Sequence, residues 1–338
     1  MKRLGYVATL SLGILGSSPA WADTAAPYQG RSLTMIAGNS AGGGYDQYAR
    51  LLARHITKHI AGQPNIVVQN MAGAGGLIAA NHLFNVAPRD GATFAMFPGS
   101  ILLDGVLGNE NAKFSSEGFT PIGNMNAESD TCIAWNGRGV TTADDVFKKD
   151  VVTGATGVSS NSYIYPALMN TVLGTKFKLI TGYNGNERVM IMEKGELDAA
   201  CGVFTSTLLS VFAEQVRTKK VLVLLQMGLE RHPSLPDTPS ALDLAKSADD
   251  RQILSLAFSP LEMGRAFFAP PGIPADKTAI LQRAFADAMR DKDLLAEAGK
   301  ANMELRWFDG ARLATVIAGM AAVPEPVRLR ARQLLIKK

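Results

Sequence analysis

The sequence predicts an α/β protein made of two doubly wound lobes. Short apolar runs alternate with amphipathic stretches in two separate series, and this alternation is typical of parallel sheets covered by helices. Glycine-rich loops follow several of the apolar runs. The chain has 338 residues, which is more than a single hydrophobic core usually serves. Together these observations favour two lobes over one.

The first series opens the body of the chain. Five apolar residues recur at helical spacing and give one helix a single apolar face; they are Tyr48, Leu51, Leu52, Ile56 and Ile60. The predicted order is a strand over 33–37, a helix over 46–60, a strand over 65–69, a helix from about 76 and a strand over 93–97. This β-α-β-α-β order predicts a parallel sheet.

A second series begins after apolar runs around Ile122 and Cys132. Predicted strands lie at 151–154, 179–181, 199–204, 221–225 and 267–269, and predicted helices at 163–173, 187–193, 207–216, 275–289 and 310–320. We assign residues 23–127 and 256–338 to lobe one and residues 128–255 to lobe two. Two crossings between the lobes follow from this division.

The N-terminus has the features of a signal peptide. Lys2 and Arg3 precede an apolar run over 4–15, and small residues lead to Ala20-Trp21-Ala22. The run is too short to span a bilayer, and no later stretch holds about 18 uncharged apolar residues. We predict cleavage after Ala22 and, because no cysteine lies near that site, a periplasmic protein without a lipid anchor.

Charge argues against a nucleic-acid partner. The formal net charge is +4, and removing the leader lowers it to about +2 with both signs interspersed. The charged helices of each lobe suit solvated surfaces, so we expect a monomer.

The two cysteines, Cys132 and Cys201, lie in apolar, strand-like runs. An exported protein can keep a disulfide, but an unpaired cysteine also packs well in such surroundings. The sequence leaves both states open, because it does not give the separation of the two Cα atoms.

The loops that follow strands are where a ligand of such a sheet binds. The loop 41–46, Ala-Gly-Gly-Gly-Tyr-Asp, precedes a helix, and a helix N-terminus favours an anion through its free N–H groups and its dipole. A carboxylate can be held there without an arginine. We interpret Asp46 primarily as the N-cap of this helix and secondarily as a ligand contact.

Three further loops are rich in small residues. The loop 73–76 suggests a dinucleotide fingerprint, but Ile78 stands in place of its third glycine, so a tight turn for close packing is the preferred interpretation. The loops 98–100 and 156–161 offer hydroxyl and amide groups, which suit reversible binding of an oxygen-rich solute.

The sequence motifs give little support to an enzymatic function. His55 and His59 share a helix face at a spacing that zinc ligands use, but HExxH is absent, and a solvated face is the preferred interpretation. A dinucleotide enzyme would need an acidic residue where Phe97 and Pro98 stand. A serine hydrolase would need GxSxG, which does not occur. We expect no catalytic activity, no cofactor and no metal.

Ordered motifs resemble those of one known family. The loop 41–46 resembles Pro-Gly-Gly-Ser-x-Asp, and Asn70 followed by 71–76 resembles Asn-x-Pro-Gly-Ala-Gly-Gly. The further motifs are Pro88-Arg89-Asp90-Gly91, Tyr183-Asn184-Gly185, Gly195-Glu196-Leu197-Asp198, 235–239 and 268–274. Over nearly the whole mature chain, the sequence is thus similar to the solute receptors of tripartite tricarboxylate transporters, the Bug family.

This resemblance implies a type II periplasmic-binding-protein fold, in which two lobes joined by a two-strand hinge close on a small carboxylate. It also implies membrane transporter subunits as partners. Di- and tricarboxylates and aromatic acids stay open as ligands, and presentation to a signalling kinase stays open as an alternative role. The implied contacts are Ala41, Gly42, Gly43, Tyr45, Asp46, Ser100, Thr156, Ser159, Ser160, Asn161, Thr205 and Ser206.

The chain departs from the family pattern at three places. Ala41 replaces a proline, Gly44-Tyr45 replaces small polar residues, and Asn184 replaces a lysine. These departures bear on the identity of the ligand and not on the fold.

Overall fold

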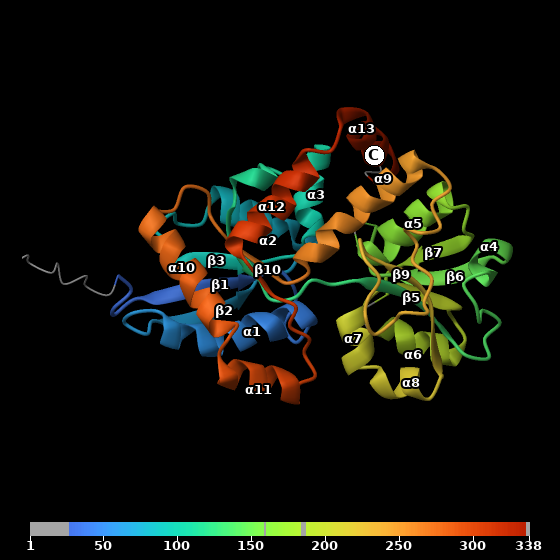
Figure 1. Cartoon of the computed structure of the whole chain (residues 1–338), viewed down its shortest axis with the longest axis horizontal. Helices are drawn as coiled ribbons and strands as arrows, with labels where there is room; N and C mark the ends of the chain where they lie inside the picture. The colour runs from blue at the N-terminus through green and yellow to red at the C-terminus, as the bar shows by residue number, and fades with distance from the viewer. Residues whose placement is uncertain (1–26, 159, 184–186, 336–338) are drawn as a thin grey trace, which may run out of the picture.

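Two separate sheets divide the molecule into two lobes (Figure 1). The computed structural model describes residues 27–158, 160–183 and 187–335. The predicted signal peptide, Ser159 and Asn184 therefore lie outside the described residues. The two-sheet arrangement confirms the predicted two-lobed α/β fold.

Lobe one contains the larger sheet. Its strands among the described residues are β1 (Ser32–Ala37), β2 (Asn65–Asn70), β3 (Thr93–Met96), β4 (Thr120–Asn124), β10 (Ala266–Ala269) and β11 (Phe308–Asp309), in the spatial order β11-β4-β10-β3-β1-β2. Strand β1 lies between β2 and β3 and pairs with both in parallel. Strand β10 returns from lobe two and pairs antiparallel with β3 and β4.

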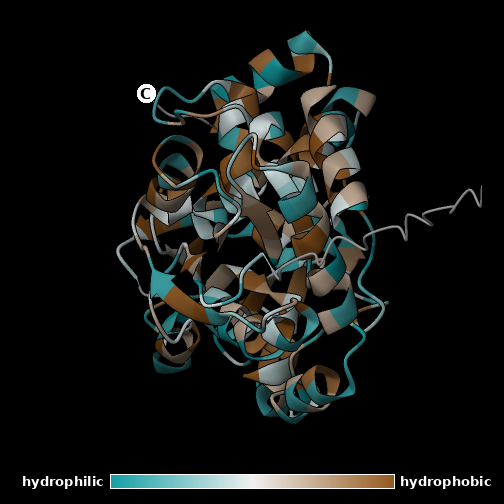
Figure 2. Cartoon of the chain, turned by 90° about the vertical axis from the view of Figure 1, so that its left-hand side faces the viewer, coloured by the Kyte–Doolittle hydropathy of each residue, from teal (hydrophilic) through white to brown (hydrophobic). Residues whose placement is uncertain are grey.

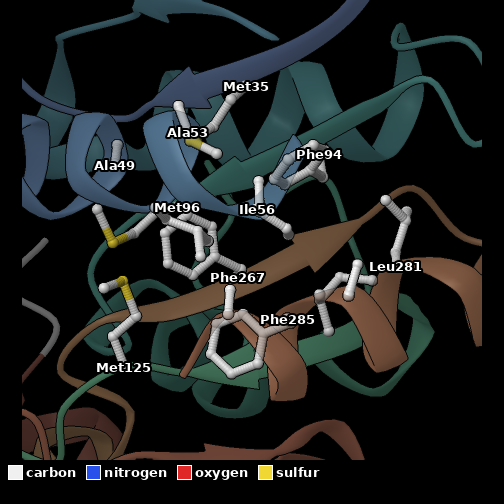
Figure 3. Close-up of a cluster of buried hydrophobic side chains, with 14 of the residues drawn as sticks. Met35, Ala49, Ala53, Ile56, Phe94, Met96, Met125, Phe267, Leu281 and Phe285 are labelled. Atoms are coloured by element: carbon white, nitrogen blue, oxygen red, sulfur yellow. The ribbon is translucent and has the colours of Figure 1, made fainter. Parts of the chain in front are cut away.

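Helices cover both faces of this sheet. They are α1 (Gly44–Ile56), α2 (Leu77–Asn85), α3 (Ser100–Leu107), α10 (Ala275–Ala288), α11 (Lys292–Lys300) and α12 (Gly310–Ala321). Met35 and Phe94 join the core under α1 and α10, as Figure 3 shows. Ile36 and Ala95, one residue along each strand, join the core under α2, α3 and α12. Successive strand residues thus point to opposite, equally buried faces.

Lobe two contains the smaller sheet. Its strands, again among the described residues, are β5 (Asp130–Trp135), β6 (Val151–Ala155), β7 (Phe177–Thr181), β8 (Ala199–Phe204) and β9 (Val221–Met227), in the order β7-β6-β8-β5-β9. Its helices are α4 (Asp145–Lys148), α5 (Asn161–Val172), α6 (Glu187–Lys194), α7 (Thr205–Ser210), α8 (Ala213–Arg217) and α9 (Ala248–Phe258). Strands β6, β7 and β8 are parallel, and β5 runs antiparallel to β8 and β9.

The chain crosses between the lobes twice. The first crossing is the segment 125–129, which joins β4 to β5. The second passes through α9 and a 3-10 turn, Ser259–Met263, and leads directly into β10, so strands flank the crossings but do not span them. Met125 N donates to Arg265 O at 3.0 Å and Glu128 N to Leu261 O at 2.8 Å. These bonds hold the two crossings together, and α13 (Glu325–Leu335) packs beside them on α3, α5 and α9.

The two cysteines form a disulfide. Cys132 and Cys201 are register partners on the neighbouring strands β5 and β8, with their Cα atoms 4.0 Å apart. Both are fully buried in the lobe-two core. The sequence left open whether the cysteines are paired or free, and the structure shows that they are paired.

Most predicted elements lie within a few residues of their observed bounds. The helix predicted over 207–216 is instead split into α7 and α8, because the backbone at Phe212 leaves the helical range (φ −110°, ψ 18°). The helix predicted over 46–60 spans Gly44–Ile56 and is followed by a 3-10 turn. Hydropathy mapped on lobe one shows apolar strands inside and polar loops outside (Figure 2). None of the described helices is long and apolar enough to cross a membrane.

Candidate functional site

Three strand-to-helix loops of lobe one lie at one edge of its sheet. Ala37 is aligned with Asn70 on β2 and with Met96 on β3, so these parallel strands end side by side. A Cβ atom at Gly76 would lie 2.7 Å from Pro98, which shows how closely the second and third loops pack. Gly76 also has φ +106°, a conformation that favours glycine. The prediction of a tight turn for close packing at 73–76 is thus confirmed.

The first loop leads into α1, and Asp46 anchors it. Helix α1 begins at Gly44, so its N-cap is Gly43 and the prediction of Asp46 as N-cap is wrong. One carboxylate oxygen of Asp46 accepts hydrogen bonds from Gly42 N and Arg50 Nε, each at 2.9 Å, and the other accepts one from Asn70. Burial alone would raise the pKa of Asp46, but these three donors lower it to about 2. Both oxygens are therefore engaged in holding the loop.

A groove of about 580 Å³ opens beside this loop and is shared by both lobes. No side chain caps the first turn of α1 among the described residues. The wall from lobe two is the start of α7, including Ser206 and Thr207. Four of the predicted contacts line this groove, namely Gly42, Gly43, Asp46 and Ser206. Ala41 is exposed on the same loop.

Two predicted hydroxyl groups are engaged inside the protein. Thr205 Oγ1 lies 2.6 Å from Ser129 Oγ, and Ser206 Oγ donates to Glu128 Oε1 at 2.7 Å. These bonds tie the start of α7 to the first crossing between the lobes.

The loop after β6 contains a second group of predicted contacts. Ser160 is the N-cap residue of α5, and its hydroxyl lies 2.7 Å from that of Ser162. Thr156 N donates to the same Ser162 hydroxyl at 3.0 Å. Asn161 lines a cavity of about 20 Å³ together with Ser100 of lobe one. The structure thus brings Ser100 and Asn161 together across the lobes, whereas Ser159 lies outside the described residues.

A buried arginine that the sequence analysis missed joins the lobes below the first loop. The guanidinium of Arg265, 1% exposed, lies 4.6 Å from the ring centre of Tyr45 and 4.8 Å from that of Phe204. It also pairs with Glu128 Oε1 at 3.2 Å. A Cβ atom at Gly44 would lie 3.3 Å from Arg265 Nη2, so this positive charge lies directly under the loop. Tyr45 thus packs on Arg265 and Phe204, and burial raises its pKa to about 12.

Asp130 is a second buried charge that the sequence analysis missed. It is the first residue of β5 and is 0% exposed. Burial raises the pKa of Asp130 to about 7, although a hydrogen bond from Asn161 opposes the shift. In the sequence, its only signal is a carboxylate directly before an apolar run.

The two histidines that were considered as metal ligands bind acidic side chains. His55 Nε2 lies 2.7 Å from Glu297, and His59 Nε2 lies 2.8 Å from Asp291. Both histidines face the acids at α11, so the prediction of a solvated helix face is wrong. In the described ranges, no group of three or more His, Cys, Asp or Glu side chains is placed to hold a metal ion.

Two α/β lobes whose helix N-termini face a shared groove define a protein of the periplasmic-binding-protein fold. More specifically, the chain belongs to the tripartite tricarboxylate transporter family receptor group, whose family model matches residues 48–323. This confirms the family that the sequence motifs suggested.

Individual relatives are distant in sequence. The UPF0065 protein of the TAR-I ttuE-ttuC' intergenic region of Agrobacterium vitis is 26% identical over 271 residues, which are 78% of this chain and 73% of the relative. MatC from Rhodopseudomonas palustris with bound malate is 20% identical with a TM-score of 0.66, over 90% of this chain and 98% of MatC. An R. palustris protein with adipate is 17% identical with a TM-score of 0.66, over 89% of this chain and 97% of that protein. The two structures share the fold.

Proposed function

We propose that this chain is a periplasmic receptor that captures a small carboxylate between its lobes and delivers it to the membrane subunits of a tripartite tricarboxylate-type transporter. The observation that carries this proposal is the N-terminus of α1. It has no side-chain cap, and the loop before it opens on a groove whose other wall belongs to lobe two. Free N–H groups and the helix dipole favour an anion there.

The charge of Arg265 supports the same assignment. Its guanidinium lies under Gly44. Burial alone would lower the pKa of Arg265, but Glu128, Tyr45 and Tyr48 together raise it above its ordinary value. Arg265 therefore remains cationic below the loop, where it forms part of the groove wall although its side chain is almost fully buried. A carboxylate at the loop would gain from this positive field.

Closure gives the receptor its mechanism. A ligand that touches both lobes stabilises the closed state, and only that differential contact shifts the population. Malate and adipate, bound by the two structural neighbours, are both dicarboxylates. We therefore propose dicarboxylates as the first ligands to test, followed by tricarboxylates and aromatic acids. We further propose that the receptor is a monomer and has no catalytic activity.

The Gly43→Val variant tests the site. The backbone at Gly43 is extended (φ −76°), and an added Cβ would meet only Ser40 O at 3.5 Å, so the fold tolerates a side chain. The side chain would crowd the N–H groups of the first turn. We expect at least a hundredfold loss of affinity, about 2.7 kcal/mol, in isothermal titration calorimetry with the carboxylate that gives the largest thermal shift.

A matched control is Gly319→Val, on the exposed face of α12 and away from the groove. It should bind like the wild type. Equal affinity of Gly43→Val and the wild type would contradict the proposed site. If no carboxylate of the panel raised the melting temperature, the proposed function would be contradicted.

A further inference from the structure

One carboxylate oxygen of Asp130 has no hydrogen-bond partner among the residues that the structure describes. Its Oδ2 accepts a hydrogen bond from Asn161 Nδ2 at 3.1 Å. Its Oδ1 is buried and has no partner among the described residues. A buried polar atom without a partner is unfavourable, and more so when it carries charge. Such an atom in a native protein calls for an explanation.

Tyr165 has a second unpartnered atom on the same face of α5. It follows Asn161 by four residues, so both side chains lie on one face of the helix. Its hydroxyl is buried and, within the described part of the chain, has no partner. Burial and the charge of Asp130 both raise the pKa of Tyr165. Asp130, Asn161 and Tyr165 are together called the Asp130 cluster.

The Asp130 cluster lies where the two lobes meet. Asn161 and Tyr165 line the cavity of about 20 Å³ to which α3 of lobe one contributes Ser100 and Asp104. Asp130 is the register partner of Phe204, whose ring contacts Tyr45 on α1. The cluster therefore lies at the cleft edge of the lobe-two sheet, facing α3 of lobe one across a small cavity and connected through Phe204 and Tyr45 to the helix that follows the first loop.

Nearby cations are committed to other acceptors. Three charges act on Asp130: Glu128 raises its pKa, whereas Arg188 and Arg265 lower it. Arg188 donates to Gly154 O at 3.0 Å and to Cys201 O at 2.6 Å. Arg265 donates to Gly264 O and pairs with Glu128. Neither arginine thus bonds Asp130 in the described structure, and its Oδ1 stays available as an acceptor.

Building on the proposed function, we infer that the Asp130 cluster selects carboxylates that also carry a hydrogen-bond donor, such as a hydroxyl or ammonium group. In the closed state the lobe-one loop holds the carboxylate of the ligand. The donor group binds Asp130 Oδ1, and the hydroxyl of Tyr165 completes its hydrogen bonding. A ligand without the donor leaves Oδ1 buried and unpaired, and sites of this kind reject such analogues strongly.

Matched pairs of acids test this inference by calorimetry on the mature protein. The pairs are malate and succinate, 2-hydroxyglutarate and glutarate, and 4-hydroxybenzoate and benzoate, with aspartate as the ammonium probe. In each pair that binds, we expect the wild type to prefer the hydroxylated member by at least about tenfold. Aspartate and succinate form a further pair, in which the donor is an ammonium group. If they bind, we expect the same preference for aspartate.

Two substitutions then locate the preference. Asp130→Asn places an NH2 group where Oδ1 lies, because Asn161 Nδ2 donates to the Oδ2 position and keeps the carbonyl oxygen of the new amide there. This variant should remove the preference. Tyr165→Phe should weaken the preference for the hydroxylated acid while leaving helix α5 intact. This variant tests the inference if Asp130→Asn does not fold. The matched control is Asp198→Asn, at the opposite end of β8, where the carboxylate accepts from Val152 N.

The outcomes separate the two proposals. Equal affinities within every binding pair of the wild type would overturn the inference and leave the carboxylate receptor standing. A preference that persists in both Asp130→Asn and Tyr165→Phe would also overturn the inference. A failure of every acid in the panel to bind would overturn the proposed function, and the inference with it.

Discussion

The two lobes present opposite kinds of carboxylate at the edges that face each other. Asp46 in lobe one has both oxygens engaged, and its pKa is lowered to about 2. Asp130 in lobe two has one oxygen unpartnered within the described residues, and its pKa is raised to about 7. Both side chains are nearly inaccessible to solvent, but Asp130 lies deeper in the protein, so its deeper burial and its smaller number of donors both contribute to the difference between the two pKa values.

This difference indicates that the two lobes have different roles in ligand recognition. In lobe one, Asp46 fixes the loop so that backbone N–H groups are preorganised for an anion. In lobe two, Asp130 keeps an acceptor for which no described residue supplies a donor. A group that lowers the stability of the free protein persists where function requires it. We therefore expect variants of the two lobes to change stability in opposite directions.

The largest effect is expected at the junction, from Arg265→Met. This change removes one member of the buried pair with Glu128 and leaves an uncompensated carboxylate in the interior. Such losses cost about 3–5 kcal/mol, and the cation–π contacts with Tyr45, Tyr48 and Phe204 are lost as well. The free energy of unfolding from urea titration measures the effect.

Arg54→Met is the control for this prediction, because it breaks a solvent-exposed pair with Glu297. Its expected cost is below about 1 kcal/mol. Similar costs for Arg265→Met and Arg54→Met would show that the junction contributes no more than a surface ion pair.

A smaller effect of opposite sign is expected from Asp130→Asn. In the folded protein Asp130 keeps its proton up to a pH of about 7, whereas the unfolded chain releases it near pH 3.8. The folded state thus binds more protons in this window, and stability falls as pH rises through it. The Asn variant escapes this loss and should be more stable than the wild type by about 2–4 kcal/mol at pH 8.

Unfolding measured between about pH 4 and pH 8 checks this sign. The two proteins should be closest at the acid end, and the advantage of the variant should grow until it levels off above pH 7. A variant that is less stable than the wild type at pH 8 would show that Asp130 is satisfied in the folded state.

The fold could be predicted because its signals are local. Apolar alternation located β1, β2 and β3 to within about one residue, and it located most of the lobe-two strands. Helix α3 was missed because its sequence, SILLDGVL, is apolar on nearly all sides and gives no stripe. The basic stretch 328–338 favoured a solvated helical end, and α13 does extend over Glu325–Leu335, with Ala331 as its one buried residue in the described part of the chain.

The site could be predicted only in part. The loop 41–46 carries its chemistry in consecutive residues, so glycine content and the following helix sufficed. Arg265, Glu128 and Asp130 lie in or next to the two crossings and come together only after both lobes have packed. Their partners lie far away along the chain, which single-sequence patterns do not encode. Asp46 shows the limit on a local scale, since a shift of the helix start by two residues changed its role.

The smallest predicted effect comes from Asp46→Ala, which completes the contrast between the lobes. It removes an acceptor for Gly42 N, Arg50 and Asn70 and should destabilise the protein by about 1–2 kcal/mol, as the loss of a helix-capping side chain does. Because the pKa of Asp46 is lowered to about 2, its contribution is complete above about pH 4 and is lost as pH falls toward 2. Denaturant unfolding of both proteins across that range measures the difference. A gap that stays constant down to pH 2 would mean that the ionised carboxylate does not hold the loop, and lobe one would lose the preorganisation that distinguishes it from lobe two.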